Sequence, residues 1–76
     1  MTPQEVNEEA YKLIKLLYDR YKADNPEQVT RLFVLHNYIF PDKPEYGKSC
    51  GSCVKRVMNK MKEHYDNVLK PMFENK

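Results

Sequence analysis

Residues 25–40, NPEQVTRLFVLHNYIF, form the stretch of sequence that decides the fold. Asn25 is a favourable helix cap, Pro26 suits the first helical position, and Gln28 stands where a capping box places its second partner. Apolar residues then follow on more than one side of the expected helix. Such a helix is buried by its own domain or by a partner. The next residue is a proline, so the predicted helix spans about residues 26–40.

A helix is also predicted N-terminal to this stretch, over about residues 3–23. Thr2 and Glu5 form a capping box, and Pro3 lies between them at the first helical position. Apolar residues recur at steps of three or four along one stripe. They are Val6, Ala10, Leu13, Leu17 and Tyr21. Because the connection to the next helix is short, we expect the two helices to be antiparallel neighbours.

A third helix is predicted over about residues 50–70, after a loop at 41–48 that holds two prolines and a glycine. Ser49 or Ser52 starts it, and Pro71 breaks it. Its apolar residues repeat every seven positions in two interleaved series, which is a heptad pattern. The first series is Val54, Met61 and Val68, and the second is Met58, Tyr65 and Met72.

These patterns predict an all-α fold, a small three-helix bundle with a Pro-rich loop before its last helix. The 76 residues make a single domain over 1–76. The formal charge of +2, from 13 Lys and Arg against 11 Asp and Glu, excludes a strongly basic nucleic-acid protein. No apolar run reaches the roughly 20 residues of a membrane helix, and the acidic N-terminus is unlike a secretory signal. Two cysteines in such a chain indicate a reducing compartment.

The most unusual motif is Cys50-Gly51-Ser52-Cys53 at the start of the third helix. A helix N-terminus lowers a thiol pKa. Thiol–disulfide catalysis is disfavoured, however, because that chemistry is expected where a strand feeds the motif, and here a Pro-rich loop does. Zinc is the alternative, with Cys50, Cys53 and His36 as candidate ligands, completed by a carboxylate, water or another subunit. The simplest interpretation leaves both cysteines as small apolar residues, with no cofactor.

Enzymatic activity is not predicted. Ser49 and Ser52 are the only serines and suit helix capping, and neither histidine is spaced from an acidic residue in a recognisable triad. Two glycines cannot build a phosphate-binding loop. A thin bundle also leaves little room for a small-molecule substrate.

The third helix carries a basic stripe without an intervening acid. Its residues are Lys55, Arg56, Lys60 and Lys62. Such a stripe meets phosphates in a small nucleic-acid-binding accessory protein, which is one alternative function, or it is simply the solvated face of the helix.

Apolar surface exceeds what one shallow core needs, and Met-rich faces adapt to partners. The candidate interface residues are Phe33, Tyr38, Phe40, Met58, Met61, Met72 and Phe73. We therefore expect a non-catalytic helical interaction or structural module that binds a protein partner or forms a homo-oligomer, away from membranes.

The stretch LHNYIFPDKPEYGKSCGSCVKRV, residues 35–57, resembles short CxxC-containing helical proteins of Bacteroidetes bacteria and of their tailed phages, including crAss-like phages. The shared feature is a helix that ends in an aromatic-Phe-Pro step, a short loop, and a Cys-x-x-Cys that opens a basic helix. The resemblance carries over no site residue. It implies an accessory protein of the capsid or virion, located in the bacterial host cytoplasm or in the virion.

Overall fold

The computed structural model describes residues 2–20 and 25–74. They form α1 (Pro3–Leu17), α2 (Pro26–Ile39) and α3 (Gly51–His64). The chain then continues through η1, a π-helical segment (Tyr65–Leu69), into α4 (Lys70–Glu74). Neither of the two described ranges contains a β-strand, and neither holds a helix with the length and apolar character needed to cross a bilayer. The prediction of an all-α three-helix bundle is confirmed.

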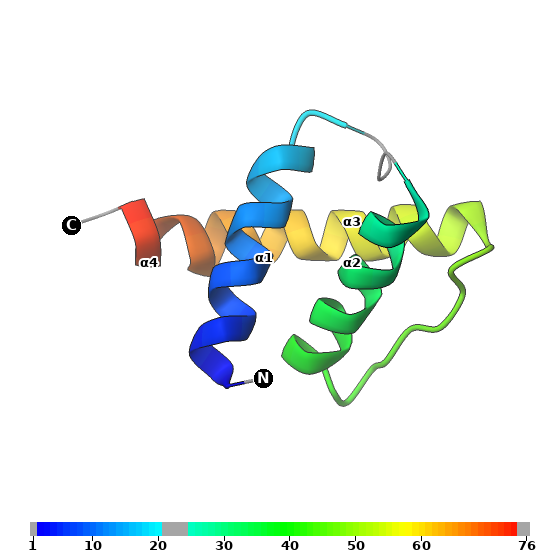
Figure 1. The fold of residues 1–76 in the computed structure, drawn as a ribbon, viewed down its shortest axis with the longest axis horizontal. Helices are drawn as coiled ribbons and strands as arrows, with labels where there is room; N and C mark the ends of the chain where they lie inside the picture. Colours follow the sequence, from blue (N-terminus) through cyan, green and yellow to red (C-terminus); the bar gives the residue numbers. More distant parts are fainter. Residues whose placement is uncertain (1, 21–24, 75–76) are drawn as a thin grey trace.

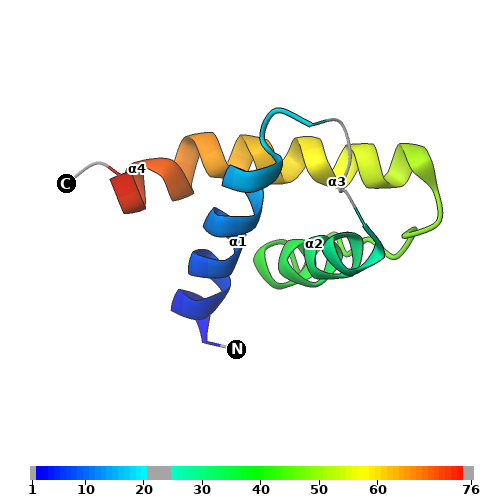
Figure 2. The same ribbon diagram turned by 45° about the horizontal axis from the view of Figure 1, so that its top comes forward.

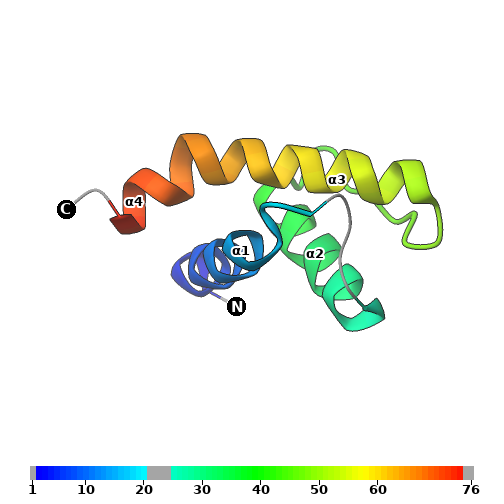
Figure 3. The same cartoon turned by 90° about the horizontal axis from the view of Figure 1, so that it is seen from above.

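The segments α3, η1 and α4 join end to end into one rod along the longest dimension of the molecule, 38 Å (Figure 1). Helices α1 and α2 both pack on this rod and run in opposite directions (Figure 1). Seen from above, they lie on the same side of the rod and splay apart from each other (Figure 3). An ion pair between Glu9 and Arg31 links α1 to α2.

The predicted starts of α1 and α2 are confirmed at the level of single hydrogen bonds. The Glu5 backbone N–H donates to Thr2 Oγ1 at 3.2 Å, and the Thr2 N–H donates to Glu5 Oε1 at 3.1 Å. In α2, the Gln28 N–H donates to Asn25 Oδ1 at 2.9 Å. Each cap satisfies backbone N–H groups that have no partner inside the helix.

Helix α1 ends earlier than predicted, at Leu17. The Arg20 N–H donates to the Leu17 carbonyl at 2.9 Å, which closes a turn. The Tyr18 hydroxyl donates to the two carboxylate oxygens of Asp66 at 2.9 and 2.8 Å, so this turn is held against η1. The last predicted residues of the helix, 21–23, lie outside the described residues.

One apolar core joins α1, α2, α3 and η1. Its buried members are Val6, Ala10, Leu13, Ile14, Leu17, Leu32, Phe33, Leu35, Val54, Val57, Met58, Met61, Tyr65 and Leu69. The prediction that Phe33, Met58 and Met61 belong to a partner interface is therefore wrong. Phe33 lies on the buried side of α2, and Met58 and Met61 lie on the heptad face of α3, which turns toward α1 and α2.

The heptad pattern of the third helix holds only up to Tyr65. Beyond it the pattern predicts Val68 and Met72 on the buried face, but they are 39% and 50% exposed. Leu69 is buried instead, and Phe73 is partly buried with its ring centroid 4.9 Å from that of Tyr11. The buried face has moved by one residue. A π-helical turn accommodates one residue more than an α-helical turn, so η1 accounts for the shift.

The prediction that Pro71 breaks the helix is also wrong, since Pro71 lies inside α4. A proline in a regular α-helix collides with the carbonyl four residues before it. Here the helix is wider just before the proline, and the Lys70 N–H donates to the Tyr65 carbonyl, five residues back. The π-helical segment therefore accounts for a helix that passes through Pro71 and carries Phe73 to α1.

Candidate functional site

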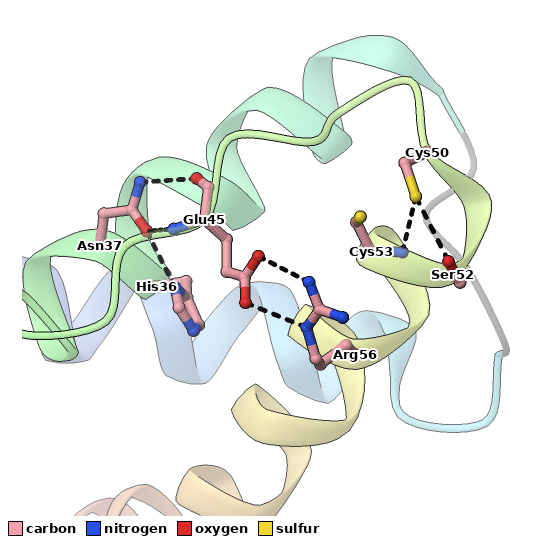
Figure 4. A network of polar contacts seen from close by, with 7 residues as sticks. All are labelled: His36, Asn37, Glu45, Cys50, Ser52, Cys53 and Arg56. Atoms are coloured by element: carbon pink, nitrogen blue, oxygen red, sulfur yellow. Dashed lines mark hydrogen bonds and ion pairs between the residues drawn. The ribbon is translucent and has the colours of Figure 1, made fainter.

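The loop between α2 and α3 returns along α2 and is fastened there by one side chain. The Asn37 Nδ2 donates to the Glu45 carbonyl at 2.9 Å, and the Glu45 N–H donates to Asn37 Oδ1 at 2.9 Å. The side-chain amide thus pairs with both backbone groups of Glu45, as a neighbouring strand would (Figure 4). This contact orients the Glu45 side chain toward α3.

Glu45 and Arg56 form a bidentate ion pair between the loop and the first turns of α3. Arg56 Nε donates to Glu45 Oε2 at 3.0 Å, and Arg56 Nη2 donates to Oε1 at 2.9 Å. The hydrogen bonds from Arg56 hold the pKa of the Glu45 carboxyl below its usual value. The paired geometry suits guanidinium and carboxylate and fixes the loop relative to α3.

Cys50 caps α3, although the sequence predicted Ser49 or Ser52 for this place. The Cys53 backbone N–H donates to Cys50 Sγ at 3.3 Å, and Ser52 Oγ lies 3.3 Å from the same sulfur (Figure 4). The thiol of the first cysteine thus occupies the position where the unpaired N–H groups of the helix point. Both cysteines are free and partly exposed.

The two thiols titrate differently. Hydrogen bonds from the Cys53 thiol, the Ser52 hydroxyl and the Cys53 N–H lower the pKa of Cys50 from 9.0 to about 7. The hydrogen bond to Cys50, and then burial, raise the pKa of Cys53. Arg56 acts in the opposite direction on Cys53, because its positive charge favours a thiolate there. The Cys50 thiol therefore loses its proton more readily than the Cys53 thiol.

Gly47 makes room for the second thiol. A Cβ atom at this position would lie 2.9 Å from Cys53 Sγ and 3.0 Å from Cys53 Cβ, closer than side chains tolerate. The loop can lie against the cysteines only because it has no side chain at this point. Gly51, in contrast, is not needed for close packing, since nothing lies within 4 Å of a Cβ atom built there.

His36 does not join the cysteines as the sequence suggested. Its ring is buried, and its Nδ1 lies 2.9 Å from Asn37 Oδ1. In Figure 4 the Glu45–Arg56 pair lies between His36 and the two thiols. Over residues 2–20 and 25–74, His, Cys, Asp and Glu side chains nowhere gather in a group of three that could hold a metal ion. The set Cys50, Cys53 and His36 is thus not one site, because the ion pair occupies the intervening space.

The second histidine, His64, is half-buried and not a plain surface residue. Its ring meets the Phe40 ring edge-on with centroids 5.6 Å apart. The Nε2 atom is buried and has no hydrogen-bond partner among the described residues. Burial lowers the pKa of His64, so the neutral imidazole is favoured. Nothing in the sequence indicated that His64 is half-buried, because its neighbours are the charged Glu63 on one side and Tyr65 on the other.

Most of the predicted basic stripe is engaged within the chain. Arg56 is paired with Glu45, and the Lys60 ammonium lies 5.1 Å from the centroid of the Phe40 ring. Lys62 Nζ donates to the backbone carbonyl of Arg20. Lys55 is exposed. Three of the four basic side chains of the stripe therefore already have a partner within the chain.

The outer face of α2 presents apolar side chains that the core does not use. Val34 and Tyr38 are 44% and 53% exposed and lie one helical turn apart. Val34 also lines an open groove of about 810 Å³ between α1 and α2, together with Leu13, Arg31 and Leu35. A second hollow, lined in part by Val34 and Tyr38, extends this surface toward Pro41.

Of the predicted interface residues, Tyr38 and Met72 are exposed. Phe40 and Phe73 are partly buried against the core. Val34 was not among the residues predicted from sequence, although the signal was present. It precedes Tyr38 by one turn, on the side of α2 opposite the buried Leu32 and His36.

Comparison with protein-family models, curated proteins and solved structures finds no match for this chain. The resemblance of residues 35–57 to short phage and Bacteroidetes proteins therefore stays an expectation from sequence.

Proposed function

We propose that this protein is a helical interaction module that packs on a larger protein assembly through the outer face of α2. The observation that carries the proposal is the exposure of Val34 and Tyr38, one turn apart on a helix whose opposite side is buried. Clustered apolar side chains on the surface of a small protein usually mark an interface.

The shape of this surface favours a helix of another protein as its partner. The groove between α1 and α2 is open, and its lining includes the apolar side chains of Leu13, Val34 and Leu35. Recognition of an amphipathic helix uses such a groove, because side chains spaced three or four residues apart fill it along its length. Arg31 and Glu27 also line the groove and supply both signs of charge for orienting the partner.

The specific setting that we propose is an accessory role in the capsid or virion of a tailed phage, and it depends on the resemblance of residues 35–57 alone. We do not propose nucleic-acid binding, because Arg56, Lys60 and Lys62 are held by Glu45, Phe40 and Arg20.

The test compares the purified chain with the double variant Val34→Lys/Tyr38→Lys. We expect the wild type to bind an apolar fluorescent dye and to self-associate at raised concentration in light scattering. The double variant should lose most of both signals while keeping its helical circular dichroism, since substitutions at exposed positions change stability by about 0.5 kcal/mol or less.

Tyr46→Lys is the matched control, because Tyr46 is 78% exposed but lies in the loop, away from α2. It removes a comparable aromatic ring and should leave dye binding and association as in the wild type. A monomer without dye binding would refute the proposal. An equal loss of signal in the control and the double variant would also refute it. Recovery of the chain with density-purified phage particles tests the proposed setting.

A further inference from the structure

We propose that Cys50 and Cys53 form a thiol–disulfide exchange site, and that its substrate is an accessible disulfide of another molecule. This site is separate from the proposed docking surface on α2. It lies at the opposite end of the connecting loop, where α3 begins (Figures 2 and 4).

Three features favour this chemistry, and none of them is a β-strand. These are a first cysteine at a helix N-terminus, a backbone N–H that points at its sulfur, and a second thiol nearby; the first two favour the thiolate. A strand in the usual context only delivers the chain to that place. Here α3 begins at Gly51, the Cys53 N–H donates to Cys50 Sγ at 3.3 Å, and the second cysteine stands three residues after the first, on the first turn of the same helix.

The choice of residues supports a chemical role over simple capping. Serine is one of the strongly preferred helix caps, and serines stand at 49 and 52, on either side of Cys50-Gly51. The cap is nevertheless Cys50, and the Ser52 hydroxyl is turned to the same sulfur at 3.3 Å. Gly47 lets the loop pack closely beside Cys53, since a Cβ atom at position 47 would come within 2.9 Å of its sulfur.

The two thiols have different roles in the exchange. The Cys50 thiolate attacks a substrate disulfide, forms a mixed disulfide with one of its sulfurs and releases the other as a thiolate. Cys53 then loses its proton to solvent and attacks Cys50 Sγ, which releases the remaining substrate sulfur as a thiolate. Two electrons have passed from the cysteine pair to the substrate, so Cys50 and Cys53 end as a disulfide and the substrate as two thiols.

The thiolate content sets the expected rate. With its pKa lowered from 9.0 to about 7, Cys50 holds about fifty times more thiolate at neutral pH than an ordinary thiol. The nucleophilicity of a thiolate falls with its pKa, here by about eightfold, so the net gain is about sixfold. Cys53, whose pKa is raised, should react more slowly than Cys50.

Arg56 assists the second step from the next turn of α3. Its guanidinium favours the thiolate of Cys53, which must form before Cys53 can attack. Glu45 holds Arg56 in place by the bidentate ion pair. Arg56 is therefore a positioning residue for the second thiol.

The experiment mixes the fully reduced protein with excess glutathione disulfide at neutral pH, stops the reaction with acid at intervals, and identifies the products by mass spectrometry. The wild type should lose both thiols and retain no glutathione. Cys53→Ser should retain one glutathione on Cys50, because nothing can release it. Cys50→Ser should react more slowly than Cys53→Ser, because only Cys50 lies at the helix N-terminus with a backbone N–H donating to its sulfur.

Arg56→Gln removes the positive charge beside Cys53 and tests the second step separately. The first attack should keep its rate, while the mixed disulfide should persist longer than in the wild type. A second experiment uses insulin as the protein disulfide substrate and a dithiol as the reductant. Faster insulin reduction that is lost in Cys50→Ser extends the substrate to protein disulfides, and no acceleration restricts it to small disulfides.

Several results would overturn the inference. They are a wild type that keeps its two free thiols, a wild type that retains glutathione as the Cys53→Ser variant does, and equal rates for the two single-cysteine variants. Zinc binding by the reduced protein is measured as well. Tight uptake of half a zinc ion per chain, with loss of exchange, would show a metal site shared by two copies in place of a redox site.

Discussion

Substitutions at Val68 and Leu69 distinguish the π-helical register from an uninterrupted heptad. A regular heptad places Val68 in the core and Leu69 outside it. The structure does the reverse, since Leu69 is fully buried and Val68 is 39% exposed. The two residues are adjacent, so their substitutions share the same helix and the same local contacts.

The expected magnitudes differ clearly. Leu69→Ala removes a fully buried side chain, which costs about 2–5 kcal/mol of unfolding free energy. Val68→Ala loses part of an exposed side chain but gains helix propensity, so the net change should stay within about 0.5 kcal/mol. The total stability of a chain this short is about 4–11 kcal/mol, so Leu69→Ala removes a large part of it.

The assay is equilibrium urea unfolding followed by far-UV circular dichroism. Leu69→Val is included in case Leu69→Ala does not fold, and it should cost about 1 kcal/mol, which is about 4–8 °C in the melting temperature. A larger loss for Val68→Ala than for either Leu69 variant would refute the π-helical register and the shifted face that depends on it.

Three further predictions concern the loop, a histidine and a cap. Gly47→Ala should destabilise the protein by about 1–3 kcal/mol because its Cβ meets Cys53 at 2.9–3.0 Å, whereas Gly51→Ala meets nothing and should be neutral or stabilising in thermal melts. Burial lowers the folded-state pKa of His64 below the 6.5 of the free side chain. As the pH falls, the unfolded chain therefore takes up a proton on His64 before the folded protein does. The contribution of neutral His64 to the free energy of unfolding is fully present above pH 6.5 and is lost as the pH drops toward the folded-state pKa. The urea midpoint should therefore fall less over this pH range in His64→Gln than in the wild type. Thr2→Ala removes the α1 cap and should cost about 1 kcal/mol in urea unfolding, and an unchanged midpoint would contradict the capping box.

The starts of the first two helices could be predicted from sequence because helix capping is local. Thr2 and Asn25 bond to backbone groups three residues away, and the apolar spacing along each helix identifies its buried side. The loop was predictable for the same reason, since proline and glycine act on their own backbone.

The candidate thiol site was only half visible in the sequence. The Cys-x-x-Cys motif is contiguous and therefore easy to find, but its surroundings come from three different parts of the chain. Asn37 lies in α2, Glu45 in the loop and Arg56 in α3, and no spacing rule relates them. Their contacts excluded His36 from the cysteines, and the clash at Gly47 explains why the loop can lie against them.

By itself, the sequence determined the helical class, the caps and the apolar faces, because these depend on residues within a few positions of one another. Tertiary structure decided which apolar residues fill the interior of the protein and which remain for a partner. Phe33 and Met58 went to the core, whereas Val34 and Tyr38 stayed on the surface. It also decided the register after Tyr65, since one π-helical turn shifts every later residue around the helix.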